Sequence, residues 1–102
     1  MNELAVLLSA KSLYAEEETL KWRVVEIFEG SLGPDHPNVA TALNNLALLL
    51  QATNRLSEAE PLMRRAVEIF EASLGPDHPS TQTVRENLEN LLAEMGPEGP
   101  AG

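Results

Sequence analysis

The chain contains no cysteine, which excludes disulfides, thiolate metal ligands and cysteine nucleophiles together. Aromatic residues make up only 4% of its 102 residues, so Leu, Val and Ala must build the hydrophobic core. Apolar runs such as residues 46–50 are far too short to span a bilayer. Glu3 stands where a secretory signal would carry basic residues. We therefore expect a soluble, cytoplasmic protein with no membrane partner.

Basic residues are also scarce, since 7 Lys and Arg stand against 16 Asp and Glu, for a net charge of −9. Binding to nucleic acid or to an anionic membrane needs clustered positive charge, so neither partner is expected. The sequence shows no nucleophile–base pair, glycine-rich phosphate loop or cluster of metal ligands. We expect no enzyme activity, no cofactor and no metal site.

The most informative feature that is present is a repeat. The segment SLGPDHP occurs at residues 31–37 and again at 73–79, which is an offset of 42 residues. At this offset, residues 18–37 match residues 60–79 at 15 of 20 positions, and residues 2–10 match 44–52 at 6 of 9. A fixed period of this length indicates stacked structural units, and such stacks provide binding surfaces. The chain holds about two and a half units.

Each unit is predicted to contain two helices. Apolar residues recur at helical spacing over residues 38–53 and 56–73, and Asn54 can end the first of these helices in a left-handed conformation. Gly75 is placed to end the second helix, and Pro79 suits the first turn of the next. The fold class is therefore all-α. We expect a helical domain over residues 1–95, with repeat boundaries near 33–37 and 75–79, and a disordered Pro/Gly tail at 96–102.

The histidine of SLGPDHP could suggest a metal ligand. One His per unit supplies too few convergent ligands, so we expect His36 and His78 to act in the turn or as helix caps. Asp35 and Asp77 also precede helices, where a negative charge complements the helix dipole.

The repeated residues resemble tetratricopeptide repeats of the 42-residue kind found in kinesin light chains. The resemblance rests on VATALNNLA at residues 39–47, EAEPL at 58–62, RAVEI at 65–69 and LGPDHP at 74–79. It implies antiparallel helix pairs stacked into a right-handed superhelix. It also implies a non-catalytic protein–protein interaction module whose concave groove, lined by the first helix of each pair, binds peptide segments of a protein partner.

The resemblance also implies which residues face that groove. Asn side chains suit it because their amides both donate and accept hydrogen bonds, although Asn45 and Asn87 could instead link neighbouring helices. No Lys or Arg occurs among the candidates, so a C-terminal carboxylate is not the expected ligand. Asn2, Val6 and Ser9 are the corresponding residues of the first unit. The groove candidates are Thr41, Asn44, Asn45, Leu48, Gln51, Glu86, Asn87 and Asn90.

The first unit departs from the repeat at its turn and on its second helix. Ser12 replaces the turn residue Asn54, and no Gly, Pro or Asn interrupts residues 9–13. Glu17 and Lys21 replace apolar residues in a favourable i,i+4 order, and Trp22 replaces an Arg. Two interpretations stay open: an ordinary terminal hairpin, or one fused helix over about residues 3–31.

The fused helix would leave the apolar residues Leu4, Leu7 and Leu8 without a hairpin partner. A second chain could then cover them, which would give a helix-exchanged homodimer. Self-association as a structural scaffold is therefore the alternative function. The self-association candidates are Leu4, Leu7, Leu8, Ser12, Glu17, Lys21 and Trp22.

Overall fold

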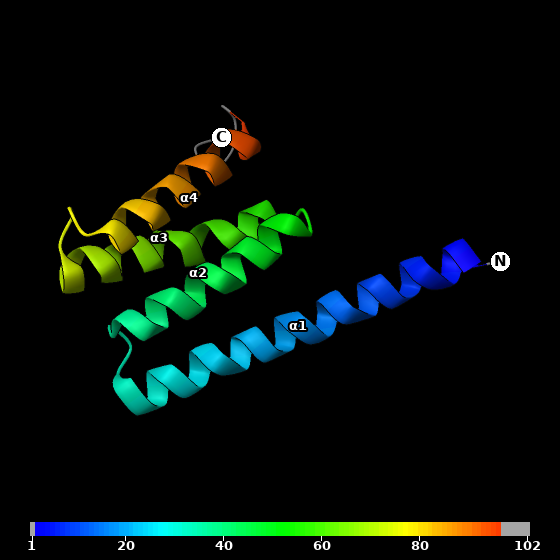
Figure 1. The fold of residues 1–102 in the computed structure, drawn as a ribbon, viewed down its shortest axis with the longest axis horizontal. Coiled ribbons are helices and arrows are strands. Elements are labelled where there is room, and N and C mark those ends of the chain that lie inside the picture. The colour runs from blue at the N-terminus through cyan, green and yellow to red at the C-terminus, as the bar shows by residue number, and fades with distance from the viewer. Residues whose placement is uncertain (1, 97–102) are drawn as a thin grey trace.

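The computed structural model describes residues 2–96, with side chains from residue 13 onward, and consists of four helices joined by short turns (Figure 1). These are α1 (Asn2–Leu32), α2 (Pro37–Ala52), α3 (Leu56–Leu74) and α4 (Pro79–Met95). Within this described part there is no strand, and each helix packs against the next along the chain. The predicted all-α class is confirmed. The predicted tail lies outside the described residues, except for Gly96.

The two SLGPDHP segments each end one helix. Gly33 and Gly75 follow α1 and α3 with φ angles of 96° and 91°, which glycine adopts readily and other residues rarely do. Asn54 lies in the turn between α2 and α3 with a φ angle of 64°, which is the left-handed conformation predicted for it. These three residues therefore explain why α1, α2 and α3 stop where they do.

The same segments also start the following helices. Pro37 and Pro79 occupy the first turn of α2 and α4, where their missing N–H costs no hydrogen bond. His36 is the N-cap of α2, and its Nδ1 accepts a hydrogen bond from the N–H of Asn38 at 3.0 Å. His78 caps α4 in the same way at 3.0 Å. The predicted capping role of the two histidines is confirmed.

The core lies around α2 and α3, whose inward faces are almost wholly buried. Most of the apolar residues at helical spacing on α2 and α3 are buried, and only Leu56 and Leu62 are partly buried. The buried ones are Val39, Ala42, Leu43, Leu46, Ala47 and Leu50 on α2, and Ala59, Met63, Ala66, Val67 and Phe70 on α3. Among the described side chains, Val25 is the one apolar residue of α1 that is fully buried, and α4 contributes Val84 and Leu91. The core is therefore centred on the one complete repeat.

The first helix is the unusual element. α1 runs for 31 residues without a break, or about 46 Å at 1.5 Å per residue. Its N-terminal part extends well beyond the other three helices instead of folding back along the rest of α1 (Figure 1). Of the two interpretations of the first unit, the fused helix is the one the structure confirms.

Candidate functional site

The first candidate surface is formed by α2 and α4, which are the first helices of consecutive units. Asn87 Nδ2 donates a hydrogen bond to Asn44 Oδ1 at 3.0 Å across the two helices. Gln51 Nε2 likewise donates to Glu94 Oε2 at 2.8 Å near the other end of α4. The structure therefore brings three of the groove candidates into hydrogen bonds that join α2 to α4.

A hollow of about 270 Å³ lies at one end of this surface. Thr41 and Asn44 of α2 line it together with Phe70 of α3 and Thr83 and Val84 of α4. The hydroxyl of Thr41 donates to the carbonyl oxygen of Pro37 in its own helix at 3.3 Å. This hollow offers a mixed apolar and hydroxyl surface beside the Asn44–Asn87 pair.

The remaining groove candidates are available for contact. Leu48 is the only large apolar residue with strong exposure outside α1 within the described part of the chain, at 39%. Asn45, Glu86 and Asn90 are exposed. None of these four side chains is engaged in a hydrogen bond among the described residues. The four asparagines therefore fall into two groups. Asn44 and Asn87 link neighbouring helices, whereas Asn45 and Asn90 face outward.

The second candidate surface is one face of α1. Its residues can be compared directly with α3, because the two helices are equivalent at the 42-residue offset. Ile27 is 55% exposed, whereas its equivalent Ile69 is 4% exposed. Val24 is 41% exposed, whereas Ala66 is fully buried. On α3 this face is covered, and the same face of α1 is open.

The self-association candidates whose side chains are described all lie on α1. Glu17 and Trp22 are exposed, with Trp22 at 39%, and Lys21 is half-buried. Glu17 and Lys21 form no ion pair with each other in the described structure, so the favourable spacing is not used. Leu4, Leu7, Leu8 and Ser12 precede residue 13, so their side chains are not among those that the structure describes.

The exposed apolar residues on this face were missed by the sequence reasoning. Leu13 and Leu20 are 60% and 57% exposed, the two largest exposed fractions among the large apolar residues of the described structure. Their spacing of seven residues from each other, and of Leu20 from Ile27, is visible in the sequence. That signal was masked because the repeat matches Leu20 and Ile27 to Leu62 and Ile69, which are partly and wholly buried on α3.

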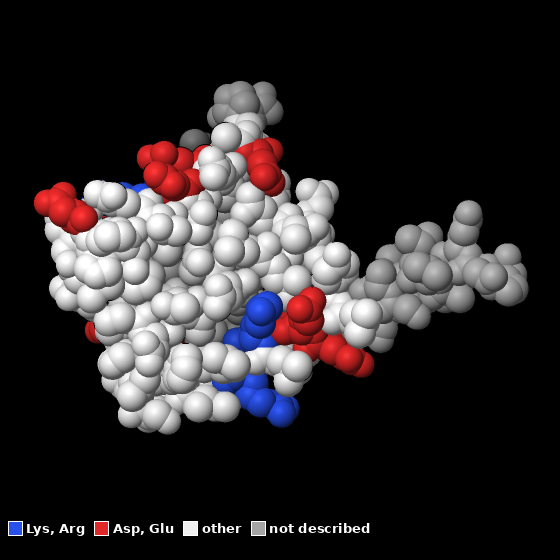
Figure 2. Space-filling model, in the orientation of Figure 1, with Lys and Arg blue, Asp and Glu red and all other residues white. Residues whose placement is uncertain are grey.

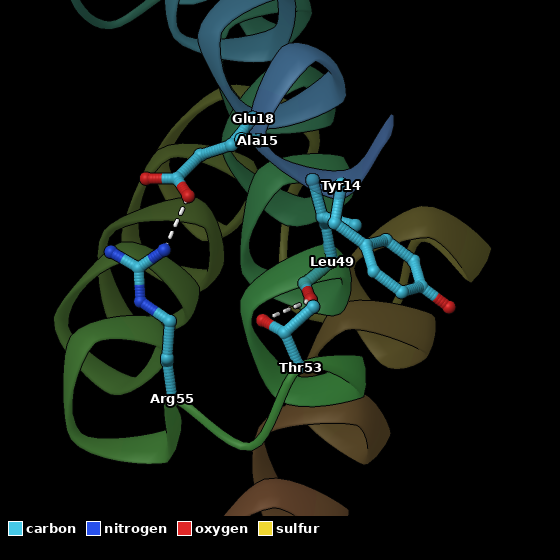
Figure 3. Close-up of a pocket in the computed structure, with 6 residues that line it drawn as sticks. All are labelled: Tyr14, Ala15, Glu18, Leu49, Thr53 and Arg55. Atoms are coloured by element: carbon cyan, nitrogen blue, oxygen red, sulfur yellow. Dashed lines mark hydrogen bonds and ion pairs between the residues drawn. The ribbon is translucent and has the colours of Figure 1, made fainter. Parts of the chain in front are cut away.

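A third feature joins α1 to the α2–α3 turn (Figure 3). Arg55 forms ion pairs with Glu18 of α1 and with Glu58 of α3, the latter at 2.6 Å. The hydrogen bond to Glu58 and, to a smaller extent, the one to Glu18 raise the pKa of Arg55 above its ordinary value. The hydrogen bond from Arg55 lowers the pKa of Glu58. A cavity of about 370 Å³ beside this pair is lined by Tyr14, Ala15, Glu18, Leu49, Thr53 and Arg55.

Arg85 joins the last helix to α3. It lies at a position that is occupied in α2 by the buried apolar residue Leu43. It is half-buried, and its Nε donates to Glu71 of α3 at 2.9 Å. A charged residue at this position therefore ties α4 to α3 through a carboxylate.

The chemistry available on these surfaces is that of recognition. Among the side chains of residues 13–96, no group of three or more His, Asp or Glu is arranged to hold a metal ion. No helix in the described part of the chain is both long and apolar enough to cross a membrane. What the surfaces offer is amide and hydroxyl groups on α2 and α4, and apolar side chains on α1.

Comparison with known families agrees with the geometry. A family model described as Tetratricopeptide repeat matches residues 1–38 and 39–80 as two adjacent repeats. A search of curated proteins gives no match.

Proposed function

Because the chain belongs to the tetratricopeptide repeat family, a non-catalytic module that mediates protein–protein interactions, we propose that it binds a peptide segment of a partner along α2 and α4. The observation that carries this proposal is the Asn44–Asn87 hydrogen bond, which joins the two helices. It leaves Asn45, Leu48 and Asn90 facing outward along the same surface.

The chemistry of this surface indicates the class of peptide. Asn45 and Asn90 can each donate and accept, which suits the alternating donors and acceptors of an extended backbone. Leu48 supplies an apolar contact, and Glu86 adds negative charge. The groove candidates carry no Lys or Arg. We therefore expect a neutral or basic segment rather than a terminal carboxylate.

A peptide array screened with the intact chain tests this function. Asn45→Ala and Leu48→Ala should each weaken binding of the selected peptide about fivefold or more, because an interface anchor typically contributes over about 1 kcal/mol. Glu68→Ala, an exposed change on α3, is the matched control and should leave binding unchanged. Equal affinities for all three variants with intact helicity would place the binding surface elsewhere.

A second candidate function is self-association through α1. The observation that favours it is the distribution of exposed apolar side chains: of the eight large ones in the described structure, all except Leu48 lie on α1. The continuous α1 also keeps residues 2–10 away from the face that their equivalents cover on α3. The helix-exchanged homodimer is one form of this association. Sedimentation velocity from low to high micromolar concentration tests it, and a single monomeric species throughout would contradict it.

A further inference from the structure

The exposed apolar side chains on α1 lie on one straight seam. Leu13, Leu20 and Ile27 are seven residues apart, and Val24 lies between the last two at spacings of four and three. Alternating spacings of three and four keep residues on one stripe of a helix, as in two-stranded coiled coils. Each of the four is between 41% and 60% exposed. We call these four residues the α1 seam.

The seam has room for another helix. α1 packs against α2 through Val25 and Phe28, which lie about 130° and 70° around the helix from the centre of the seam. The equivalent α3 is packed against helices on two sides, α2 and α4. A second helix on α1 would therefore reproduce the burial that α3 already has.

We infer that the seam is occupied by α1 of a second copy of this chain, running antiparallel. This inference rests on the second proposed function, self-association through α1. A two-fold axis between Glu18 and Thr19 sets Leu13 against Val24 of the second copy, so that apolar residues meet on both sides of the axis. The same alignment sets Leu20 against Glu17 of the second copy.

Charge complementarity supports this direction and register. Glu16 and Arg23 flank the seam on the side away from α2, both are exposed, and neither belongs to an ion pair in the described structure. They line a shallow hollow of about 430 Å³ with Ala15, Thr19 and Leu20. Acidic and basic side chains lie next to each other over the middle of α1 (Figure 2).

The antiparallel alignment brings Glu16 beside Arg23 of the second copy, and symmetry repeats the pair. A parallel pairing of the same seam residues would place Arg23 beside Phe28 of the second copy. Arg23 would then have no acidic partner. The antiparallel direction also puts the α2–α4 bodies at opposite ends of the paired α1 helices. Both flanking charges are satisfied only in the antiparallel arrangement.

The angular positions of residues around α1 distinguish pairing along the seam from an exchange of helices between two copies. Along a straight helix, positions 4 and 8 lie about 160° and 120° around the axis from position 20. One partner helix cannot contact both sides of a straight α1, so exchange of residues 2–10 would require α1 to bend. The seam needs no bend, because its members share one side.

Glu17 sets the strength of this association. It interrupts the seam at the position of Ala59 in the complete repeat. A single polar residue at such a position lowers stability while it helps to fix alignment. The dimer should therefore be weak and concentration-dependent.

Charge reversal with sedimentation equilibrium on the full chain tests the inference. Glu16→Arg and Arg23→Glu should each weaken self-association by roughly tenfold or more, because like charges then face each other twice. An equimolar mixture of the two variants should associate at least as tightly as the wild type, because both pairs become attractive again. Glu26→Arg, the same charge change on another exposed part of α1, should have no effect. Circular dichroism checks that each variant keeps its helices.

Two results would overturn the inference, and they are distinguishable. A wild-type chain that stays monomeric at all concentrations would overturn both this inference and self-association itself. A wild-type dimer whose mixed variants associate no better than either variant alone would overturn the antiparallel alignment while leaving self-association in place.

Discussion

At the scale of single residues, a few polar side chains cap the helices or join one helix to another. His36 and His78 each cap a helix through Nδ1, so the only two histidines of the chain serve the same local role in successive units. Arg55 joins α1 to the complete repeat through Glu18 and Glu58. Each of these roles depends on a hydrogen bond or an ion pair that a single substitution removes.

The capping histidines give the first prediction. His36→Ala should destabilise the fold by about 1 kcal/mol, because the N–H of Asn38 loses its acceptor. His36→Asn is the control and should recover most of the loss, since asparagine is a favourable N-cap residue. Urea unfolding followed by circular dichroism measures both. If the Ala and Asn variants are equally stable, the side-chain cap does not contribute.

Arg55 gives the second prediction, which concerns acid. Arg55 holds the pKa of Glu58 below its ordinary value of 4.5, so this interaction stabilises the fold above that pH and is lost as the pH falls through the lowered pKa. Arg55→Gln should therefore destabilise the protein most at neutral pH, and the difference from the wild type should shrink in acid. Glu68→Gln serves as the control, since Glu68 is exposed and has no ion pair in the described structure. Thermal unfolding at a series of pH values checks this. A difference that stays constant with pH would contradict it.

At the scale of elements, equivalent helices have unequal surroundings. α3 is covered on two sides and α1 on one, although the two share most of their sequence. The difference begins at the turn, where Asn54 breaks the chain direction with φ of 64° and Ser12 lies inside a continuous helix. The turn at Asn54 therefore lets α2 cover one face of α3, whereas the unbroken α1 leaves the equivalent face open.

The third prediction compares one residue type at equivalent positions. Ile69→Ala should cost about 2–4 kcal/mol, because Ile69 is 4% exposed in the core. Ile27→Ala should cost less than about 0.5 kcal/mol in the monomer, because Ile27 is 55% exposed. Denaturant unfolding at low protein concentration gives both values. Equal costs would show that α1 is covered by its own chain.

Much of the element structure could be predicted from the sequence, because it depends on local chemistry. The helix ends at Gly33 and Gly75 and the starts at Pro37 and Pro79 follow from backbone preferences of those residues. The break in the repeat at Ser12 correctly indicated a fused helix as one of two outcomes.

The candidate sites were less predictable, because they depend on which neighbours are present. A repeat shows that Ile27 and Ile69 are equivalent but does not show whether both have a partner. In the same way, Asn44 and Asn45 are adjacent in sequence, yet only Asn44 reaches a neighbouring helix. The groove and self-association assignments remain predictions.

At the scale of the whole molecule, the chain combines one complete repeat with a long arm. The arm is α1, which projects beyond the α2–α4 body (Figure 1). The body offers the amide-lined surface of α2 and α4, and the arm offers the α1 seam. The two surfaces lie on different helices, so binding a peptide and pairing with a second copy need not exclude each other.

The central claim is that α1 is one helix, since this leaves the seam open. The chain has no cysteine, so Glu3→Cys and Glu26→Cys can carry spin labels for double electron–electron resonance. The labelled chain is mixed with an excess of unlabelled protein, so that distances between labels on two different copies do not contribute to the signal. A variant carrying Lys11→Thr, Ser12→Asn and Leu13→Arg, which copies the turn at residues 53–55, is the hairpin control. A continuous helix predicts about 35 Å between the labelled positions, whereas a distance below about 20 Å, as expected for the control, would contradict the account.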